Sequence, residues 1–362
     1  MRINYITYDS WWDTDKTILQ QLCKHYVLNC YVLNPKHDEC KFQTKEIEGV
    51  NKIREVNQNC RDRNPKSFLI ALYFLSIILR DIRKKNILNV FVPGKNPWLL
   101  FLFFLFAPKK QTLICIHNYK EHSGGKNLGL REYIKTKYYR HFRYFLFYSQ
   151  QQADEYRKHH IEGKAFCLNM PLKDFGIPNV KRTDQSVRFL FFGMIKEYKR
   201  LDLFIRAAGL VADKRGKFII AGFAPHWETY ENLIVDKDLF ELNIRFVDND
   251  EIPNFFCNSD FLVLPYDDAT QSGPMLIALN YALPVISSDI KEFRGFVEDG
   301  VNGFLFEKGD PNSLANVIKK LLNLTPEERD NIKKAQNKRK LDYISTSNTL
   351  QNFADIVKQM TK

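Results

Sequence analysis

Short apolar runs rich in aromatic and β-branched residues recur along the chain, separated by stretches with the spacing of amphipathic helices. The runs fall into two series, and each series predicts the strands of one sheet. The first comprises residues 3–7, 26–33, 88–92, 112–116 and 144–149, and the second comprises residues 188–192, 217–221, 244–247, 261–265, 285–287 and 304–306. Strands that alternate with helices form parallel sheets through right-handed crossovers. The pattern therefore predicts an α/β protein with two parallel sheets.

The segment 171–186 separates the two series. It reads PLKDFGIPNVKRTDQS, with two prolines, a glycine and mixed charge, which is typical of a linker between domains. We therefore predict two Rossmann-like domains, residues 1–180 and 181–345, and a C-terminal helix in residues 346–362 that packs back on the first domain. In such folds the ligand binds at the carboxyl ends of the strands, so we expect a site in a central cleft that both sheets face.

Two strongly apolar stretches, residues 68–79 and 98–107, contain twelve and ten residues. A helix needs about 20 residues to cross a bilayer, so neither stretch is long enough. Burial against a sheet is the favoured interpretation. The alternative places one end of either helix on a bilayer surface, because the first runs into Arg80, Arg83 and two lysines and the second runs into Lys109 and Lys110.

Charge is distributed unevenly along the 362 residues, whose formal net charge is +12. Residues 1–182 carry 31 Lys and Arg against 16 Asp and Glu, whereas residues 183–362 carry 23 against 26. The excess therefore belongs to the first domain, which excludes an evenly basic protein and indicates a local anionic partner. Nucleic acid, a membrane surface and a phosphorylated substrate all fit at this point.

The seven cysteines are scattered, with no CxxC pair and no Cys/His cluster at zinc spacing. We therefore expect reduced thiols in a cytosolic protein. The N-terminal segment MRINYITYDSWWDTD lacks a basic region followed by an apolar core and a cleavage site, so no signal peptide is expected. The predicted location is the cytoplasm, with peripheral contact on the inner face of the membrane as an extension.

The second half contains two strands that each end at a glycine. The segment RFLFFGMIKEYKR ends its strand at Gly193 and continues in a loop that carries Lys196 and Lys199, while KFIIAGF ends its strand at Gly222. A glycine lets the backbone turn tightly, and a lysine in the loop beyond it can reach a diphosphate held at a helix terminus. A solvated lysine on a βα turn is the structural alternative.

A third strand in this half ends at Pro265 and leads into a polar loop. The loop reaches Gln271, Ser272 and Gly273 before a helix from about Pro274 to Tyr281. Backbone amides at a helix N-terminus, next to a serine and a small glycine, can hold an anion. Helix capping is the commoner role of such residues, so the loop alone does not identify a site.

Taken together and in this order, these residues resemble the donor-binding domain of GT-B glycosyltransferases, and specifically the retaining family 4 that uses nucleotide-sugars. The resemblance covers nearly the whole second half, through the segment VEDGVNGFLF. It implies that Gly193 and Gly222 line the nucleotide site and that Lys199 contacts the diphosphate. It further implies that the backbone at Ile252 contacts the base and that the loop amides hold the donor phosphates, the loop residues being Ser272 and Gly273.

The chain departs from this family pattern in its carboxylates. The family's usual pair of glutamates would fall on Ala269 and Ile277, and the arginine often found after the first glycine is Met194. The glutamate that usually anchors the donor ribose is therefore replaced by an apolar residue. We expect Ser272 or Gln271 to take over the polar contacts, and Lys196 to supply a cation near the first glycine.

In the first half, a nearly all-apolar strand ends at the segment HNYKEHSGG. It delivers His117 to the carboxyl end of a buried strand, with Asn118 and His122 close behind. A strand-end histidine is also a common packing residue. The segment resembles the acceptor domain of the same family, which implies that His117 lies beside the transferred sugar and that Asn118 and His122 contact the acceptor.

The first strand leads into YDSWWDTD, where many relatives have a glycine-rich loop. The spacing of Asp13 and Asp15 matches the D-x-D pattern of metal-nucleotide sites, and residues 248–250 repeat it. A three-residue match is weak, and Asp13 serves equally well at the start of a helix. We expect no metal and no other cofactor, and we expect Asp13 and Trp12, together with Trp11, to contact the acceptor.

The stretch REYIKTKYYRHFR at residues 131–143 interleaves five cations with aromatic residues. A nucleic-acid surface, an interfacial helix, and a solvated face over core aromatics remain open at this point. No recognition motif for nucleic acid accompanies the stretch, so we do not expect nucleic acid as a partner.

The resemblance implies a retaining GT-B glycosyltransferase that moves a sugar from a nucleotide-diphospho-sugar to an acceptor hydroxyl. The expected partners are this donor and a glycan or lipid-linked acceptor in bacterial surface-glycan synthesis, with peripheral contact to an anionic membrane. Two alternatives stay open, namely a nucleotide-sugar epimerase on the same scaffold and a non-catalytic protein that binds membrane or nucleic acid.

Overall fold

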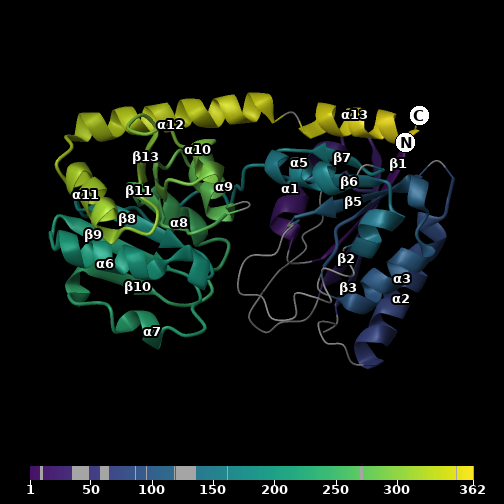
Figure 1. Ribbon diagram of the computed structural model, residues 1–362, viewed down its shortest axis with the longest axis horizontal. Helices are drawn as coiled ribbons and strands as arrows, with labels where there is room; N and C mark the ends of the chain where they lie inside the picture. Colours follow the sequence, from purple (N-terminus) through teal and green to yellow (C-terminus); the bar gives the residue numbers. More distant parts are fainter. Residues whose placement is uncertain are drawn as a thin grey trace. The chain divides into compact units, whose positions relative to one another are not determined.

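The computed structural model describes residues 1–8, 11–34, 49–57, 65–85, 87–94, 96–117, 119, 136–160, 162–269, 272–347 and 349–361. The chain divides into two compact units (Figure 1). Unit 1 comprises residues 1–171 and 347–362, and unit 2 comprises residues 172–346.

Unit 1 is built on a seven-stranded parallel sheet in the order β3-β2-β1-β4-β5-β6-β7. The strands are β1 (Arg2–Tyr8), β2 (Val27–Asn34), β3 (Lys52–Asn57), β4 (Ile87–Phe91), β5 (Thr112–Ile116), β6 (Tyr144–Phe147) and β7 (Lys164–Cys167). The helices with full bounds are α1 (Trp12–Leu22), α2 (Pro65–Ile82), α3 (Pro97–Phe106), α5 (Gln150–His159) and α13 (Thr349–Thr361), and a 3₁₀ turn spans Lys109–Gln111. Every residue of β4, β5 and β6 is buried, as expected for parallel strands covered on both faces.

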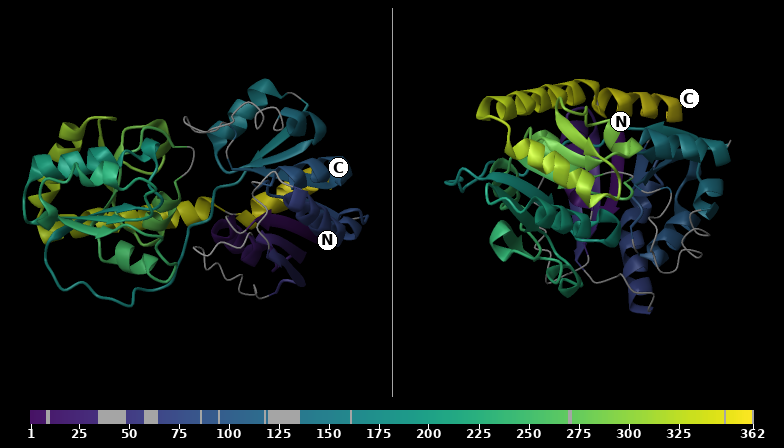
Figure 2. Two further views of the ribbon diagram at one scale, coloured as in Figure 1. Left: turned by 90° about the horizontal axis from the view of Figure 1, so that it is seen from below. Right: turned by 60° about the vertical axis from the view of Figure 1, so that its left-hand side comes forward.

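Unit 2 repeats the plan with a six-stranded parallel sheet in the order β10-β9-β8-β11-β12-β13. The strands are β8 (Val187–Phe192), β9 (Gly216–Ala221), β10 (Phe240–Asn243), β11 (Phe261–Leu264), β12 (Val285–Ser288) and β13 (Gly303–Phe306). The helices are α6 (Leu201–Val211), α7 (Glu228–Glu231), α8 (Ile252–Cys257), α9 (Gly273–Asn280), α10 (Lys291–Arg294), α11 (Pro311–Leu322) and α12 (Pro326–Thr346), with 3₁₀ turns η3 (Glu197–Lys199) and η4 (Lys237–Leu239). Helices lie on both faces of this sheet (Figure 2).

Both sheets have a topological switch point, where the strand order reverses. In unit 1 it lies between β1 and β4, and in unit 2 it lies between β8 and β11. Open α/β sheets bind ligands outside the carboxyl ends of the strands at such points. The two parallel Rossmann-like sheets predicted from the sequence are confirmed, and their topology directs attention to the loops after β8 and β11.

Three strand predictions need correction. The edge strands β3 and β7 were missed, because their sequences KIREVN and KAFC mix charged and apolar residues instead of forming apolar runs. A strand was predicted at residues 244–247, whereas the sheet pairs β10 with β9 four residues earlier in the chain. Ile244 and Val247 pack against the core from outside the sheet, which explains their apolar pattern.

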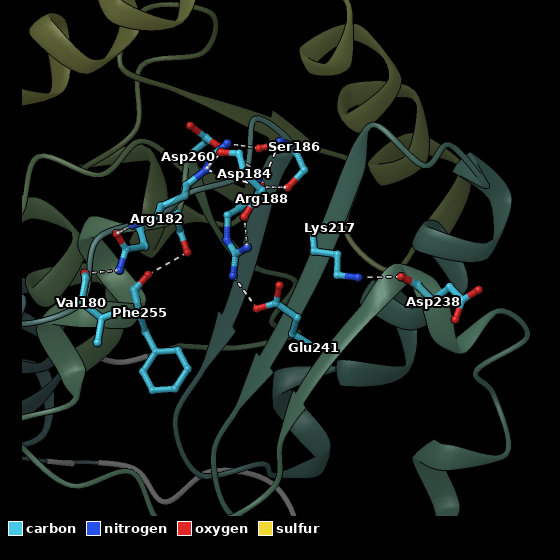
Figure 3. A network of polar contacts seen from close by, with 12 residues as sticks. Val180, Arg182, Asp184, Ser186, Arg188, Lys217, Asp238, Glu241, Phe255 and Asp260 are labelled. Atoms are coloured by element: carbon cyan, nitrogen blue, oxygen red, sulfur yellow. Dashed lines mark hydrogen bonds and ion pairs between the residues drawn. The ribbon is translucent and has the colours of Figure 1, made fainter.

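The segment predicted as a linker is attached to unit 2. The backbone amide of Phe175 donates to the hydroxyl of Tyr281 at 3.0 Å, and the amide of Asn179 donates to the side chain of Asn254 at 2.9 Å. Figure 3 shows the continuation, where the Arg182 guanidinium pairs with Asp260 at 2.7 Å beside the start of β8. Residues 172–180, which were assigned to the first domain, therefore belong to the second compact unit.

A further part of this network crosses the amino ends of three strands of unit 2 (Figure 3). Arg188 of β8 pairs with Asp184 at 2.9 Å and with Glu241 of β10, while Lys217 of β9 donates to the carbonyl of Asp238 at 2.7 Å. These contacts hold residues 182–188 at the amino-terminal edge of the sheet. The carboxyl-terminal edge, where ligands bind in this fold class, carries a separate set of residues.

The last two helices belong to different units. Helix α12 begins with a capping box, in which the Glu328 amide donates to the Thr325 hydroxyl at 3.2 Å and the Thr325 amide donates to the Glu328 carboxylate at 2.7 Å. The chain then passes into α13, which belongs to unit 1, where it packs against α1.

The apolar stretches at 68–79 and 98–107 form α2 and α3. Their inner faces are buried in the core of unit 1, but their outer faces expose large apolar side chains. Among the residues that the structure describes, no helix combines the length and hydropathy needed to cross a membrane. In the described part of the 131–143 stretch, Tyr138, Tyr139 and Phe142 are buried and Arg140 and Arg143 are exposed. These aromatics are core residues, which favours the interpretation of a solvated basic face there.

Candidate functional site

Two glycines bring the carboxyl ends of β8 and β9 into close contact in unit 2. Gly193 has φ 102° and Gly222 has φ 152°, a backbone region that other residues rarely adopt. A Cβ atom added to Gly222 would lie 2.1 Å from the carbonyl oxygen of Gly193. Both predicted glycines are therefore required by the backbone, and Gly193 lies at the end of β8, next to the switch point.

Lys199 lies beside Gly193. It ends η3 and is only 8% exposed, and a Cβ atom at Gly193 would be 3.4 Å from its Nζ. Its ammonium sits 5.5 Å from the ring centroid of Tyr266, the second residue after β11. Burial, and to a smaller extent the charge of nearby Lys196, together lower the pKa of Lys199 from 10.5 to about 8. Among the described residues no carboxylate pairs with it, so the buried cation lacks a counter-ion.

The N-terminus of α9 also lies next to Gly193. Ser272 caps the helix by accepting a hydrogen bond from the Met275 amide at 3.3 Å, and Pro274 occupies the first turn. A Cβ atom at Gly193 would be 3.7 Å from Pro274, so the helix end and the strand end are neighbours. The amide of Gly273 has no partner within the helix, as is general for a first turn, and Gln271 lies outside the described residues.

Lys173 places a second cation at the N-terminus of α9, which was not predicted from the sequence. Its Nζ lies 3.6 Å from the position of a Cβ atom on Gly273, the first residue of α9. Lys173 comes from the 172–186 segment, which has no sequence signal for ligand binding. Only the path of that segment along unit 2 brings its ammonium to the helix end. Lys199 and Lys173 thus lie close to neighbouring glycines, next to a helix N-terminus that itself favours anions.

The loops that carry these groups are tied together by Arg200. This residue has φ 51°, pairs with Asp202 at 2.9 Å and reaches Asp267 at 3.0 Å, while the amide of Asp267 donates to the Tyr198 carbonyl at 2.8 Å. The ion pairs raise the pKa of Arg200, so its charge is held firmly. Lys196, by contrast, is exposed on the same loop.

The other positions of unit 2 singled out in the sequence are Ile252, Ala269 and Ile277. Ile252 begins α8 and its side chain is buried in the core, so only its backbone is offered to a ligand. Phe223 and Phe246 stack at 4.6 Å with an interplanar angle of 10°, just beyond β9 and β10. Ala269 and Ile277, which stand where the family has glutamates, are 2% and 5% exposed.

In unit 1, His117 follows β5 and is 6% exposed. Its ring stacks on Trp11 at 3.6 Å with an interplanar angle of 5°, and the Tyr148 ring lies 4.8 Å away on a tilted approach. The Gln152 side chain donates to the His117 carbonyl and accepts from the Tyr119 amide at 2.6 Å. The histidine is therefore held in one orientation at the carboxyl edge of the sheet.

The structure corrects one acceptor residue. Trp12 is 2% exposed and packs in the core of unit 1, so its ring is not available to an acceptor; Trp11 instead lies against His117. Asp13 lies in α1, and its side chain is outside the described part. Asn118 and His122 also lie outside the described residues.

Asp15, the second aspartate of the first D-x-D pattern, has a structural role in unit 1. Asp15 is fully buried, where its carboxylate accepts hydrogen bonds from the hydroxyls of Tyr5, at 2.7 Å, and Thr7. Its side chain thus fixes α1 to β1. Among the residues that the structure describes, no group of three or more His, Cys, Asp or Glu is placed to hold a metal ion.

Comparison with known proteins finds a family model that matches most of unit 2, and curated relatives that match part of the chain. Residues 186–324 match the model of a family described as glycosyl transferases group 1. The chain is 26% identical over 259 residues to the poly(ribitol-phosphate) alpha-N-acetylglucosaminyltransferase of Staphylococcus aureus, covering 70% of this chain and 51% of that protein. Other curated relatives are matched over 36% to 38% of their lengths, so the chain spans about half or less of the relatives it matches.

Solved structures match the whole chain. A sucrose-phosphate synthase from Thermosynechococcus elongatus superposes with a TM-score of 0.72 at 14% identity, covering 100% of this chain and 99% of that one. HepE from Anabaena, solved in complex with UDP and glucose, superposes with a TM-score of 0.71 at 14% identity and the same coverage. These likenesses confirm the predicted GT-B fold.

Proposed function

We propose that this chain, a GT-B protein whose residues 186–324 form a glycosyl transferases group 1 domain, is a glycosyltransferase that uses a nucleotide-diphospho-sugar. Unit 2 binds the donor, and unit 1 binds the acceptor whose hydroxyl receives the sugar. The matched domain and the function named for the Staphylococcus aureus relative support transfer over the epimerase and the non-catalytic alternatives.

The observation that carries the proposal is the buried ammonium of Lys199. Lys199 is 8% exposed and has no paired carboxylate in the described part of unit 2. Holding its ammonium group charged at this buried position costs free energy, and a bound anion would reduce that cost. The neighbouring N-terminus of α9 and the Lys173 ammonium favour the same sign of ligand. A nucleoside diphosphate supplies that charge at the switch point of a Rossmann-like sheet.

The chemistry follows from where charge develops. When the bond between the sugar C1 and the diphosphate breaks, negative charge accumulates on the departing phosphate oxygen. Lys199 and the Gly273 amide are fixed groups that stabilise this charge, and Lys173 and Lys196 strengthen the field around them. Ser272, and Gln271 outside the described residues, stand in for the missing glutamates as polar contacts to the donor.

The resemblance supports a finer description of the reaction. We propose retention of the anomeric configuration, as in family 4, and independence from metal ions, because the ammonium groups of Lys199 and Lys173 lie beside the proposed phosphate position. The backbone of Ile252 and the glycines at 193 and 222 contact the nucleotide. On the acceptor side, His117 contacts the transferred sugar, with Asp13, Asn118 and His122 as further acceptor contacts.

The proposed acceptor is a glycan or lipid-linked molecule of bacterial surface-glycan synthesis, held at the inner face of the membrane. The Staphylococcus aureus relative is named for transfer to poly(ribitol-phosphate), and another relative, from Erwinia amylovora, is named for amylovoran biosynthesis, which supports a polymeric glycan acceptor. The enzyme itself would be cytoplasmic, with peripheral contact to anionic lipid. We propose UDP-sugars as the first donors to test, because the HepE structure contains UDP.

A panel of nucleotide-sugars separates the alternatives. Each is incubated with the full chain, with and without an acceptor fraction, while the unfolding midpoint, free nucleotide and the sugar's stereochemistry are recorded. Acceptor-dependent release of nucleoside diphosphate supports transfer. A new epimer formed without acceptor would indicate the epimerase, and no midpoint shift with any nucleotide would indicate the non-catalytic protein.

A further inference from the structure

The outer faces of α2 and α3 in unit 1 expose an unusual concentration of apolar side chains. Six large apolar residues on these two helices are between 37% and 62% exposed: Leu69, Leu72, Tyr73, Phe101, Leu105 and Phe106. Elsewhere in the described part of unit 1, only Met1 and Val27 are large apolar residues of comparable exposure. Scattered exposed apolar residues need no explanation, but a cluster on adjacent helices marks an interaction surface.

The two helices present one continuous surface because they pack against each other (Figure 1). Near their starts, the rings of Phe68 and Trp98 meet edge to face at 5.3 Å. At their ends, the Arg83 guanidinium lies 5.6 Å over the ring of Phe106 and its Nε donates to the Phe106 carbonyl at 3.4 Å. The helices are therefore parallel neighbours whose carboxyl-terminal ends lie together.

Cations gather at that shared end. Arg80, Arg83, Lys84 and Lys85 lie at or just after the end of α2, and Lys109 and Lys110 follow α3; all six are exposed. The single carboxylate in residues 65–85 and 96–111 is Asp81, which is 9% exposed and pairs with Lys84 and Lys52. The exposed apolar residues therefore lie next to a group of cations with little negative charge nearby. These six lysines and arginines are called the positive rim below.

We propose that this α2–α3 surface binds the face of an anionic lipid bilayer. Apolar side chains enter the boundary between headgroups and acyl chains, while the lysines and arginines at the rim meet the lipid phosphates. A second copy of this chain is a poorer occupant, because it would bring the same positive rim to the contact. The proposal deepens the proposed function by naming the surface that brings the enzyme to a membrane-held acceptor.

Flotation of the full chain with vesicles tests the proposal without any substrate, so its failure is distinguishable from failure of glycosyl transfer. Vesicles of phosphatidylcholine with phosphatidylglycerol are compared with phosphatidylcholine alone, at low and high salt. We expect binding to the anionic vesicles that weakens with salt. Equal binding to both vesicles, or binding that salt does not weaken, would overturn the electrostatic part.

Two sets of variants assign the binding to this surface. Replacing the rim lysines as K85Q/K109Q/K110Q should weaken affinity for the anionic vesicles about 100-fold, since each of the three lysines contributes about fivefold near such a surface. Replacing exposed apolar residues as L69S/Y73S/F101S should weaken it at least about tenfold, because less apolar area enters the boundary.

A matched control uses the exposed Val235 and Lys214 of unit 2, changed to V235S/K214Q. It should leave vesicle binding unchanged, and an unchanged unfolding midpoint should show that each variant is folded. Wild-type binding by both surface variants would overturn the proposal. So would a wild-type dimer that the same substitutions dissociate in the absence of vesicle binding, since the occupant would then be a second copy.

Discussion

Removing the Lys199 ammonium should stabilise the protein while disabling its donor site. The substitution Lys199→Met keeps the length and the apolar stem of the side chain but deletes a charge that is buried without a paired carboxylate in the described residues. Most substitutions of buried residues destabilise a protein. The opposite result is expected here because the charge, and not the packing, is the costly part of this side chain.

The size of the effect follows from the pKa of Lys199, which burial lowers from 10.5 to about 8. Each pKa unit corresponds to about 1.4 kcal/mol, so holding the ammonium in the ligand-free protein costs about 3 kcal/mol at neutral pH. Below pH 8 the lysine is charged in both the folded and unfolded states, and the full cost is present. Between about pH 8 and 10.5 the folded state loses the proton first, so the cost disappears as pH rises.

The assay is thermal and urea unfolding of wild type and Lys199→Met, with and without nucleoside diphosphate. Without ligand, the variant should unfold several degrees higher, since 1 kcal/mol corresponds to about 2–4 °C for a unit of this size. Nucleotide should raise the wild-type midpoint and leave the variant's unchanged. Lys214→Met, which removes an exposed lysine, is the matched control and should change neither value. A destabilised variant that still binds nucleotide would refute the reasoning.

Four further outcomes are expected. Gly222→Ala should lower the free energy of unfolding by about 2–4 kcal/mol in urea titration, because its Cβ would meet the Gly193 carbonyl. The control Gly209→Ala lies on α6, where no atom is near the added Cβ, and it should raise that free energy by up to about 1 kcal/mol. His117→Phe keeps the ring stack but lacks the nitrogens, and should reduce kcat about 100-fold with an unchanged donor KM; wild-type turnover would make this histidine a packing residue. Lys173→Gln should raise the donor KM about tenfold, and an unchanged KM would separate it from the phosphate site. The donor KM of the wild type should rise above about pH 8, as Lys199 loses its proton; a flat profile through pH 9 would contradict this role.

The fold was largely predictable because buried parallel strands leave a simple signal. The run Thr112–Ile116 is apolar or β-branched throughout, and its predicted bounds are those of β5. Edge strands lack this signal, because charged residues interrupt the apolar ones, as in KIREVN of β3. The apolar run at 244–247 misled the prediction because Ile244 and Val247 cover the core without joining the ladder.

Individual residues of the site were predictable where the backbone dictates them. Gly193 and Gly222 follow strands directly, and Lys199 stands in the short loop after the first of them. Lys173 was not predictable, because its position depends on a segment that crosses unit 2 before the first strand of that unit. Trp11 and Trp12 are adjacent, and sequence alone does not show which of them faces the core.

The most direct test of the account is transfer of labelled sugar. The full chain is supplied with a labelled nucleotide-sugar and a glycan or lipid-linked acceptor, and label in the acceptor is compared with released nucleoside diphosphate. The account predicts equal amounts of transferred label and released nucleoside diphosphate. In Lys199→Met both should fall together, because the variant loses about 2–4 kcal/mol of transition-state stabilisation. Nucleotide release without label in the acceptor, or equal transfer by the variant, would contradict it.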